Sequence, residues 1–185
     1  MNGRRHVLFI QGGGAGTHDE WDAKLVDSLR SELGDAYEVR YPRMPGEDDP
    51  SYAGWAPVIS EAAATLEDGA IVVGHSVGGT LLIYTLAERP PDATLAAIVL
   101  IAAPFVGAGG WPAQEVELPT DLGALLPAGV PVHVFHGLED DEVPPAHADL
   151  YARAIPQAQL HRLLGRDHQL GNDLGEVATL IRTLQ

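Results

Sequence analysis

Residues 70–79 read AIVVGHSVGG and predict a strand, a tight turn and the start of a helix. The first four of these residues are apolar and predict a buried strand, and the segment from Gly79 to Glu88 is typical of a helix. Between strand and helix lies the GxSxG pentapeptide GHSVG, residues 74–78. A serine at such a turn is held in a strained backbone conformation with its hydroxyl exposed, and the glycines let neighbouring backbone approach closely. Ser76 is therefore a candidate nucleophile.

A second interpretation of Ser76 is structural. Serine is a good N-cap, and a helix beginning at Val77 would place Ser76 at that position. The two roles are compatible, because a helix N-terminus also favours negative charge that develops beside it.

Short apolar runs recur along the chain and predict six buried strands. They are Val7–Ile10, Tyr37–Tyr41, Ala70–Val73, Ala97–Ile101, Val132–Phe135 and Gln159–Leu163. Three intervening segments carry apolar residues at helical spacing. These are Trp21, Leu25, Leu29 and Leu33; Trp55, Ile59, Ala62 and Leu66; and Val177, Leu180, Ile181 and Leu184. The alternation predicts one α/β domain over residues 1–185, with a parallel sheet covered by helices on both faces.

Active sites of such sheets lie at the carboxyl ends of the strands. Most of the chemically suggestive residues follow the predicted strands and therefore collect at that edge. One interval, residues 102–129, breaks the alternation: it is rich in Gly and Pro and has only a weak helical pattern around residues 121–126. We expect it to form an irregular excursion over the site.

Composition narrows the function. The chain has 185 residues, no cysteine and a formal net charge of -15. Disulfides, thiolate catalysis and zinc–thiolate sites are excluded. The acidity argues against a nucleic acid or an anionic membrane as partner, since both require a basic face. The apolar run after Arg5 has four residues, too short for a signal-peptide core or a spanning helix, so we expect a cytoplasmic protein.

A serine hydroxyl needs a base within hydrogen-bond reach and a third group to orient that base. Of the eight histidines, His168 follows the last predicted strand, at the edge of the sheet where the strands end, and is the candidate base. The alternative is that it is an ordinary loop histidine. The side chain of His75, next to Ser76, should point elsewhere, and His136 at a strand end favours a structural hydrogen-bonding role.

Candidate acids for orienting the base follow the fifth predicted strand in the segment HGLEDDEVP, residues 136–144. A solvated acidic loop is the alternative interpretation, and we adopt it for Glu139, Asp141 and Glu142. Asp167 lies too close to His168 in sequence to be the preferred partner. A metal site built from these acids and His147 lacks a recognised ligand spacing.

With these motifs in the order Ser, Asp, His, the chain resembles the α/β-hydrolase superfamily. The family's HGxxDxxVP pattern falls on residues 136–144 and implies that Asp140 is the acid. The loop QGGG, residues 11–14, stands where many relatives have His-Gly followed by small residues. The resemblance implies an oxyanion hole made by the backbone N–H groups of Gly13 and Val77, with Gln11 replacing the usual histidine.

Nearly the whole chain is similar to small serine hydrolases without a cap domain, of the RBBP9/YdeN-like group. The short length, the segment YPRMP at residues 41–45 and Trp55 carry that similarity. It implies a single α/β-hydrolase domain that needs no cofactor or metal and acts on a small-molecule ester.

Phe105, Trp111 and Leu122 in the irregular interval are candidates to line a shallow pocket for short to medium acyl chains; the alternative is that they are ordinary packing residues. Two other functions stay open. The scaffold could be catalytically silent and bind a partner, or the same triad could act on thioester, amide or carbon–carbon bonds.

Overall fold

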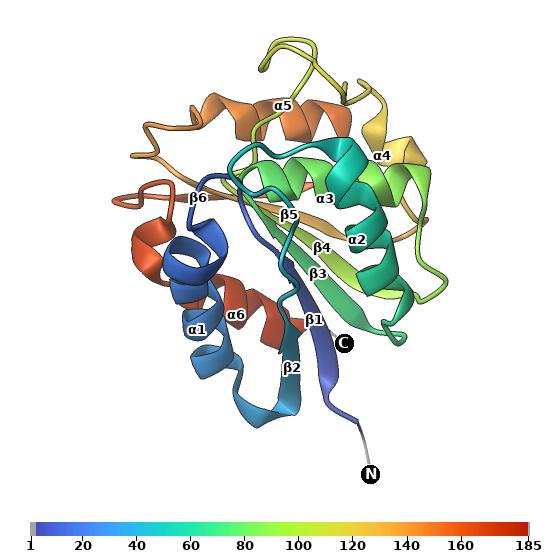
Figure 1. Ribbon diagram of the computed structural model, residues 1–185, viewed down its shortest axis with the longest axis vertical. Helices are drawn as coiled ribbons and strands as arrows, with labels where there is room; N and C mark the ends of the chain where they lie inside the picture. Colours follow the sequence, from blue (N-terminus) through green and yellow to red (C-terminus); the bar gives the residue numbers. More distant parts are fainter. Residues whose placement is uncertain (1–2, 185) are drawn as a thin grey trace.

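A computed structural model describes residues 3–184, which contain one six-stranded parallel sheet in the order β2-β1-β3-β4-β5-β6 (Figure 1). The strands are β1 (Arg5–Ile10), β2 (Tyr37–Arg40), β3 (Ala70–His75), β4 (Leu95–Ile101), β5 (Val132–Gly137) and β6 (Gln159–Leu163). All six predicted strands are present, and their ends differ from the predicted ends by no more than two residues. β2 pairs with one side of β1 and β3 with the other, so that β1 lies between them.

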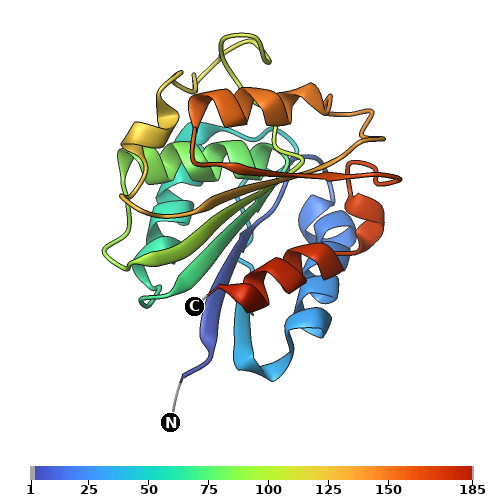
Figure 2. The same ribbon diagram turned by 180° about the vertical axis from the view of Figure 1, so that it is seen from behind.

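Helices cover both faces of this sheet (Figures 1 and 2). They are α1 (Asp22–Leu33), α2 (Tyr52–Ala64), α3 (Val77–Glu88), α4 (Leu122–Leu125), α5 (Ala146–Ala154) and α6 (Gly175–Thr183). Helices α1 and α6 bury one core with the sheet, and α2 to α5 bury the other. A π-helical turn (Thr17–Trp21) leads into α1, and 3-10 turns lie at Gly34–Ala36 and Leu170–Asn172.

Successive residues of a strand send their side chains to opposite faces of the sheet, and so into opposite cores. In β1, Val7 and Phe9 enter the core with α1 and α6, whereas Leu8 and Ile10 enter the core with α2 and α3. Both sets are fully buried, which is why the strands of a parallel sheet read as continuous apolar runs in the sequence.

The predicted helices bury apolar residues at helical spacing, but a few of the buried positions differ from those predicted. Trp21 was expected to face the core but is 50% exposed, because it ends the π-helical turn before α1 begins. Val26 takes part in the α1 core instead. In α2, Ala63 is more deeply buried than the predicted Ala62.

The turn after β3 depends on close approach of backbone. A Cβ added to Gly78 would overlap the carbonyl oxygen of Gln11 at the end of β1, and one added to Gly74 would lie 2.5 Å from Cα of Gly79. Glycine at these positions therefore lets α3 start directly against the carboxyl ends of β1 and β3.

The interval after β4 is irregular, as predicted, and contains only the short helix α4. In Figure 1 it forms the loop above α5 and α3, on the side of the sheet where the strands end. Across residues 3–184, no helix combines the length and apolar character needed to cross a bilayer.

We predict that Gly78→Ala destabilises the fold by about 2 kcal/mol or more, because the clash is with backbone that cannot rotate away. Denaturant unfolding followed by circular dichroism measures the change. Gly3→Ala is the matched control, since nothing lies within 4 Å of its added Cβ, and equal stability of the two variants would contradict the prediction.

Candidate active site

Ser76 lies in the tight turn between β3 and α3 with a left-handed backbone, φ 52° and ψ -135°. An L-residue avoids this conformation unless the surroundings impose it, so the turn is strained as the sequence predicted. Ser76 occupies the N-cap position of α3, but its hydroxyl makes no capping hydrogen bond. The hydroxyl is therefore left to interact with groups outside the helix.

The group that it meets is His168. Nε2 of His168 lies 3.0 Å from Oγ of Ser76, and Nδ1 lies 2.9 Å from Oδ2 of Asp140. The three residues follow three different strands, β3, β5 and β6, so the parallel sheet brings them to one edge. The structure thus joins the predicted nucleophile, base and acid in one hydrogen-bonded chain.

Asp140 is held by four donors. Its Oδ1 accepts the backbone N–H groups of Glu142 (2.9 Å) and Val143 (2.8 Å), while Oδ2 faces His168 Nδ1 and His136 Nε2 at 2.9 and 3.1 Å. Burial alone would raise the pKa of Asp140, but the hydrogen bonds from His136, His168 and Val143 outweigh it and lower the pKa. The carboxylate is therefore ionised and fixed in place. His136, which was predicted to have a structural hydrogen-bonding role, holds Oδ2 of Asp140.

The loop after β1 and the start of α3 each supply one backbone N–H group that is free within the part of the chain that the structure describes. Gly12 N–H donates to Oδ2 of Asp22, and Gly14 N–H donates to the carbonyl of Glu47. Among residues 3–184, the N–H groups of Gly13 and Val77 have no acceptor. A Cβ on Gly13 would lie 2.9 Å from Val77 Cγ1, so these two residues are adjacent. They are the donors that the sequence resemblance implied.

Gln11, which replaces the family's usual histidine, is fully buried beneath this loop. Its Oε1 accepts the N–H of Met44 at 2.9 Å, and its Nε2 donates to Glu47 Oε2 at 2.8 Å and to the carbonyl of Gly12 at 3.3 Å. The amide therefore ties the glycine loop to residues 44–47 and leaves no polar atom of its side chain unpaired.

Sequence reasoning missed a buried pair beside the site, Asp22 and His75. Nδ1 of His75 lies 2.9 Å from both carboxylate oxygens of Asp22. Burial alone would raise the pKa of Asp22 and lower that of His75; their mutual attraction and hydrogen bonds outweigh burial, so the pKa of Asp22 is lowered and that of His75 raised. The two are therefore an ion pair. As predicted, His75 points away from the Ser76 hydroxyl.

The hydroxyl of Ser76 opens into a polar hollow whose lining includes residues not predicted from the sequence. Glu142, expected to be only part of a solvated loop, has Oε2 3.8 Å from His168 Nε2, although its side chain is 70% exposed. Trp21 lines the same hollow with Thr17 and Gln169. No spacing in the sequence links Trp21 or Glu142 to Ser76, because loops bring them together.

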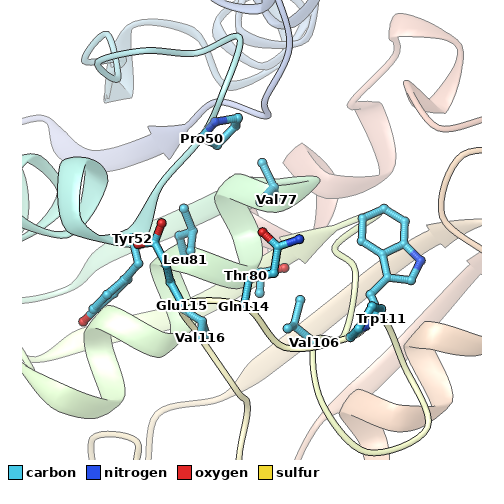
Figure 3. Close-up of a pocket in the computed structure, with 11 residues that line it drawn as sticks. Pro50, Tyr52, Val77, Thr80, Leu81, Val106, Trp111, Gln114, Glu115 and Val116 are labelled. Carbon is cyan, nitrogen blue, oxygen red and sulfur yellow. The ribbon is translucent and has the colours of Figure 1, made fainter.

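The predicted pocket residues separate into two groups. Phe105 and Leu122 are buried in the core and do not line either hollow that adjoins the elbow. Their assignment to a substrate pocket was therefore wrong. Leu122 points inward from α4, and Phe105 packs edge-on against Tyr151. Trp111 is 40% exposed and lines an apolar hollow of about 200 Å³ that begins at Val77. Figure 3 shows Tyr52 and Trp111 at opposite ends of that hollow.

The metal site considered from the sequence would combine His147 with the acids after β5. Across residues 3–184, no three His, Asp or Glu side chains are grouped as metal ligands would be. His147, which was considered as a ligand, instead accepts the N–H of Phe105 on its Nδ1 at 2.8 Å. Burial lowers the pKa of His147, so its ring is neutral.

Solved structures with the same fold cover almost the whole chain. The ydeN gene product from B. subtilis is 20% identical with a TM-score of 0.72, and the match covers 97% of each chain. The esterase RhEst1 from Rhodococcus sp. ECU1013 is 18% identical with a TM-score of 0.69, over 98% of this chain and 92% of that one. Est1E from Butyrivibrio proteoclasticus, solved with ferulic acid bound, is 16% identical with a TM-score of 0.67, over 97% and 87%.

No curated protein sequence shows a significant match to the chain. The family model described as "Alpha/beta hydrolase family" matches residues 7–128, about two thirds of the sequence, and includes the elbow and the glycine loop. With its parallel sheet, its strained serine and this match, the chain belongs to the alpha/beta hydrolase family.

Proposed function

We propose that the protein is a serine hydrolase that cleaves carboxylic esters of short to medium acyl chain through an acyl-enzyme on Ser76. One observation carries the proposal: Ser76 Oγ, His168 and Asp140 form an unbroken chain of hydrogen bonds at 3.0 and 2.9 Å. That arrangement activates a weak nucleophile at neutral pH.

In the proposed reaction His168 Nε2 takes the proton of Ser76 as Oγ attacks the ester carbonyl. The oxyanion that forms accepts hydrogen bonds from the N–H groups of Gly13 and Val77, each worth roughly 3 kcal/mol of transition-state stabilisation. Asp140 holds the imidazole in the correct tautomer and stabilises its cation. His168 then returns the proton to the leaving alkoxide, and a water activated by the same nitrogen releases the acid.

The two hollows on either side of the elbow suggest how the ester lies. The leaving group must be near His168 Nε2 to receive its proton, and this atom faces the polar hollow with Trp21 and Glu142. The acyl chain then enters the apolar hollow past Val77. Its volume of about 200 Å³ is below the roughly 300–1,000 Å³ of sites for drug-sized ligands, which favours short to medium chains.

The proposed steps use only side chains and backbone of this chain, and we expect no cofactor. A formal net charge of -15 favours a neutral small molecule over nucleic acid or an anionic membrane as partner. The cytoplasmic placement expected from the sequence remains part of this proposal.

We predict that Ser76→Ala and His168→Ala each lower kcat for p-nitrophenyl butyrate by about 10⁴-fold or more, and that Asp140→Asn lowers it by roughly 10²–10⁴-fold. Removing the nucleophile or base abolishes the covalent route, whereas the Asn variant disturbs the tautomer of His168. A fluorophosphonate probe followed by intact mass spectrometry should add one adduct to the wild type and none to Ser76→Ala.

The matched control is Asp141→Asn, because Asp141 is the exposed neighbour of Asp140 and should leave kcat unchanged. A folded wild type that neither turns over esters nor takes up the probe would sink the proposal and favour the binding-scaffold alternative. Faster turnover of thioesters or amides than of matched esters would keep the triad and change the substrate class.

A second prediction concerns the apolar hollow. Trp111→Ala removes one end wall and should lower kcat/KM for p-nitrophenyl hexanoate relative to the acetate by about tenfold, the effect of roughly 1.4 kcal/mol of lost apolar contact. Trp21→Ala is the control, because Trp21 lines the opposite hollow and should leave that ratio unchanged. An unaltered ratio in Trp111→Ala, or a wild-type preference for long chains, would contradict the assignment of this hollow to the acyl group.

A further inference from the structure

Behind the proposed triad lies a second carboxylate–histidine pair whose ionised groups do not contact the hydroxyl of Ser76. Asp22 opens α1, His75 ends β3, and their side chains are 0% and 2% exposed. Each Asp22 oxygen lies 2.9 Å from His75 Nδ1. A buried ion pair contributes little to stability compared with apolar residues of the same size, so its retention calls for another reason.

The remaining bonds of the pair point to that reason. Asp22 Oδ2 accepts the N–H of Gly12 at 2.7 Å, directly before the proposed oxyanion donor Gly13. Nε2 of His75 donates to the backbone carbonyl of His168 at 3.1 Å. Asp22 Oδ1 also accepts from Nε2 of Gln169 at 3.3 Å. The pair therefore bonds to two loops that are separated by more than 150 residues of sequence.

We infer that Asp22 and His75 are positioning residues that set the distance between the oxyanion loop and the loop carrying His168. The inference rests on the proposed function, because both loops act together only when Ser76 reacts. By accepting the N–H of Gly12, Asp22 fixes the orientation of the Gln11–Gly12 peptide, next to the peptide that carries the Gly13 N–H, and leaves the Gly13 N–H for the substrate. By holding the carbonyl of His168, His75 fixes the main chain from which the imidazole extends.

Charge is needed for this task because one carboxylate must serve several donors at once. Asp22 accepts from Gly12, His75 and Gln169, and charge-assisted bonds of this kind are short and directional. An amide in its place would offer one acceptor oxygen instead of two, so at least one of the three donors would lose its partner. Misplacement of reacting groups by about 1 Å costs up to 10²-fold in rate.

The first test is Asp22→Asn in the full chain. We expect kcat for p-nitrophenyl butyrate to fall about 10- to 100-fold, with KM changed less than about threefold. The reason is that the hydrogen bonds of Asp22 position the Gly13 N–H and His168, which act on the transition state. The affinity for butylboronic acid, which forms a tetrahedral adduct on serine, should fall by a similar factor.

Variants of His75 separate its hydrogen bond to Asp22 from its hydrogen bond to the carbonyl of His168. An Asn side chain places its amide nitrogen near the position of Nδ1, and a Gln side chain places its nitrogen near that of Nε2. His75→Asn should therefore keep the bond to Asp22 and lose the one to His168, whereas His75→Gln should do the reverse. We expect both to lower kcat and the double variant Asp22→Asn/His75→Gln to cost no more than the worse single variant, because coupled residues are not additive.

Amide hydrogen exchange gives a readout that does not depend on turnover. In Asp22→Asn, protection should fall in residues 12–16 and in residues 166–171 together, while the β4 and β5 amides keep theirs. A general loss of stability would instead raise exchange throughout the sheet. The double variant, in which neither member of the pair is charged, supplies the same measurement if a single variant fails to fold.

His133→Gln is the matched control: His133 is a buried histidine, bonded to His161 at 3.1 Å, in β5 and remote from both loops. Its kcat should be unchanged. The inference is overturned if Asp22→Asn keeps wild-type kcat and boronate affinity, or if only one of the two loops loses protection. An inactive, unlabelled wild type would overturn the proposed function, while the exchange pattern would still decide whether the pair ties the loops.

Discussion

Everything at this site depends on the contact of the start of α3 with the carboxyl end of β1. The helix begins so close to the strand that the carbonyl of Gln11 occupies the space of a side chain at Gly78. This contact forces the chain through a left-handed turn at Ser76 and brings the N–H of Val77 beside Gly13. The strain in the serine is stabilised by two fully buried strands on either side, so the packing of the sheet holds the hydroxyl in position.

Around this contact, each of two buried carboxylates is surrounded by several hydrogen-bond donors. Asp140 and Asp22 each accept multiple hydrogen bonds, and in both residues these bonds outweigh the effect of burial, so that the pKa is lowered. The two carboxylates face two histidines whose rings are 5.0 Å apart, His75 and His168. One pair reaches the hydroxyl of Ser76, and the other reaches the main chain of the loops that carry the reacting groups. The site is thus rigid because its charges are fully hydrogen-bonded.

The resemblance to the α/β-hydrolase superfamily selected Asp140 within the acidic segment after the fifth strand. The sequence itself predicted the fold well because buried parallel strands are continuous apolar runs, and it predicted that Ser76, His168 and that acidic segment lie together because parallel strands end at one edge. It failed where side chains from distant loops decide contacts. Asp22 and His75 are 53 residues apart and have no periodic relation. Phe105 and Leu122 were assigned to a pocket from composition alone, whereas packing against Tyr151 and α3 draws them into the core. Trp21 was read as a core residue because its spacing is helical, although the helix begins one residue later.

The position of His168 in the chain has a consequence for biosynthesis. His168 follows β6, the last strand and one edge of the sheet, and it meets a serine 92 residues earlier. A ribosome-bound chain that has released residues only up to β5 already holds Ser76 at the end of β3 but lacks His168. Under the proposed mechanism the serine hydroxyl therefore stays unactivated until β6 docks, and labelling by a covalent probe reports only molecules in which this edge strand is in place.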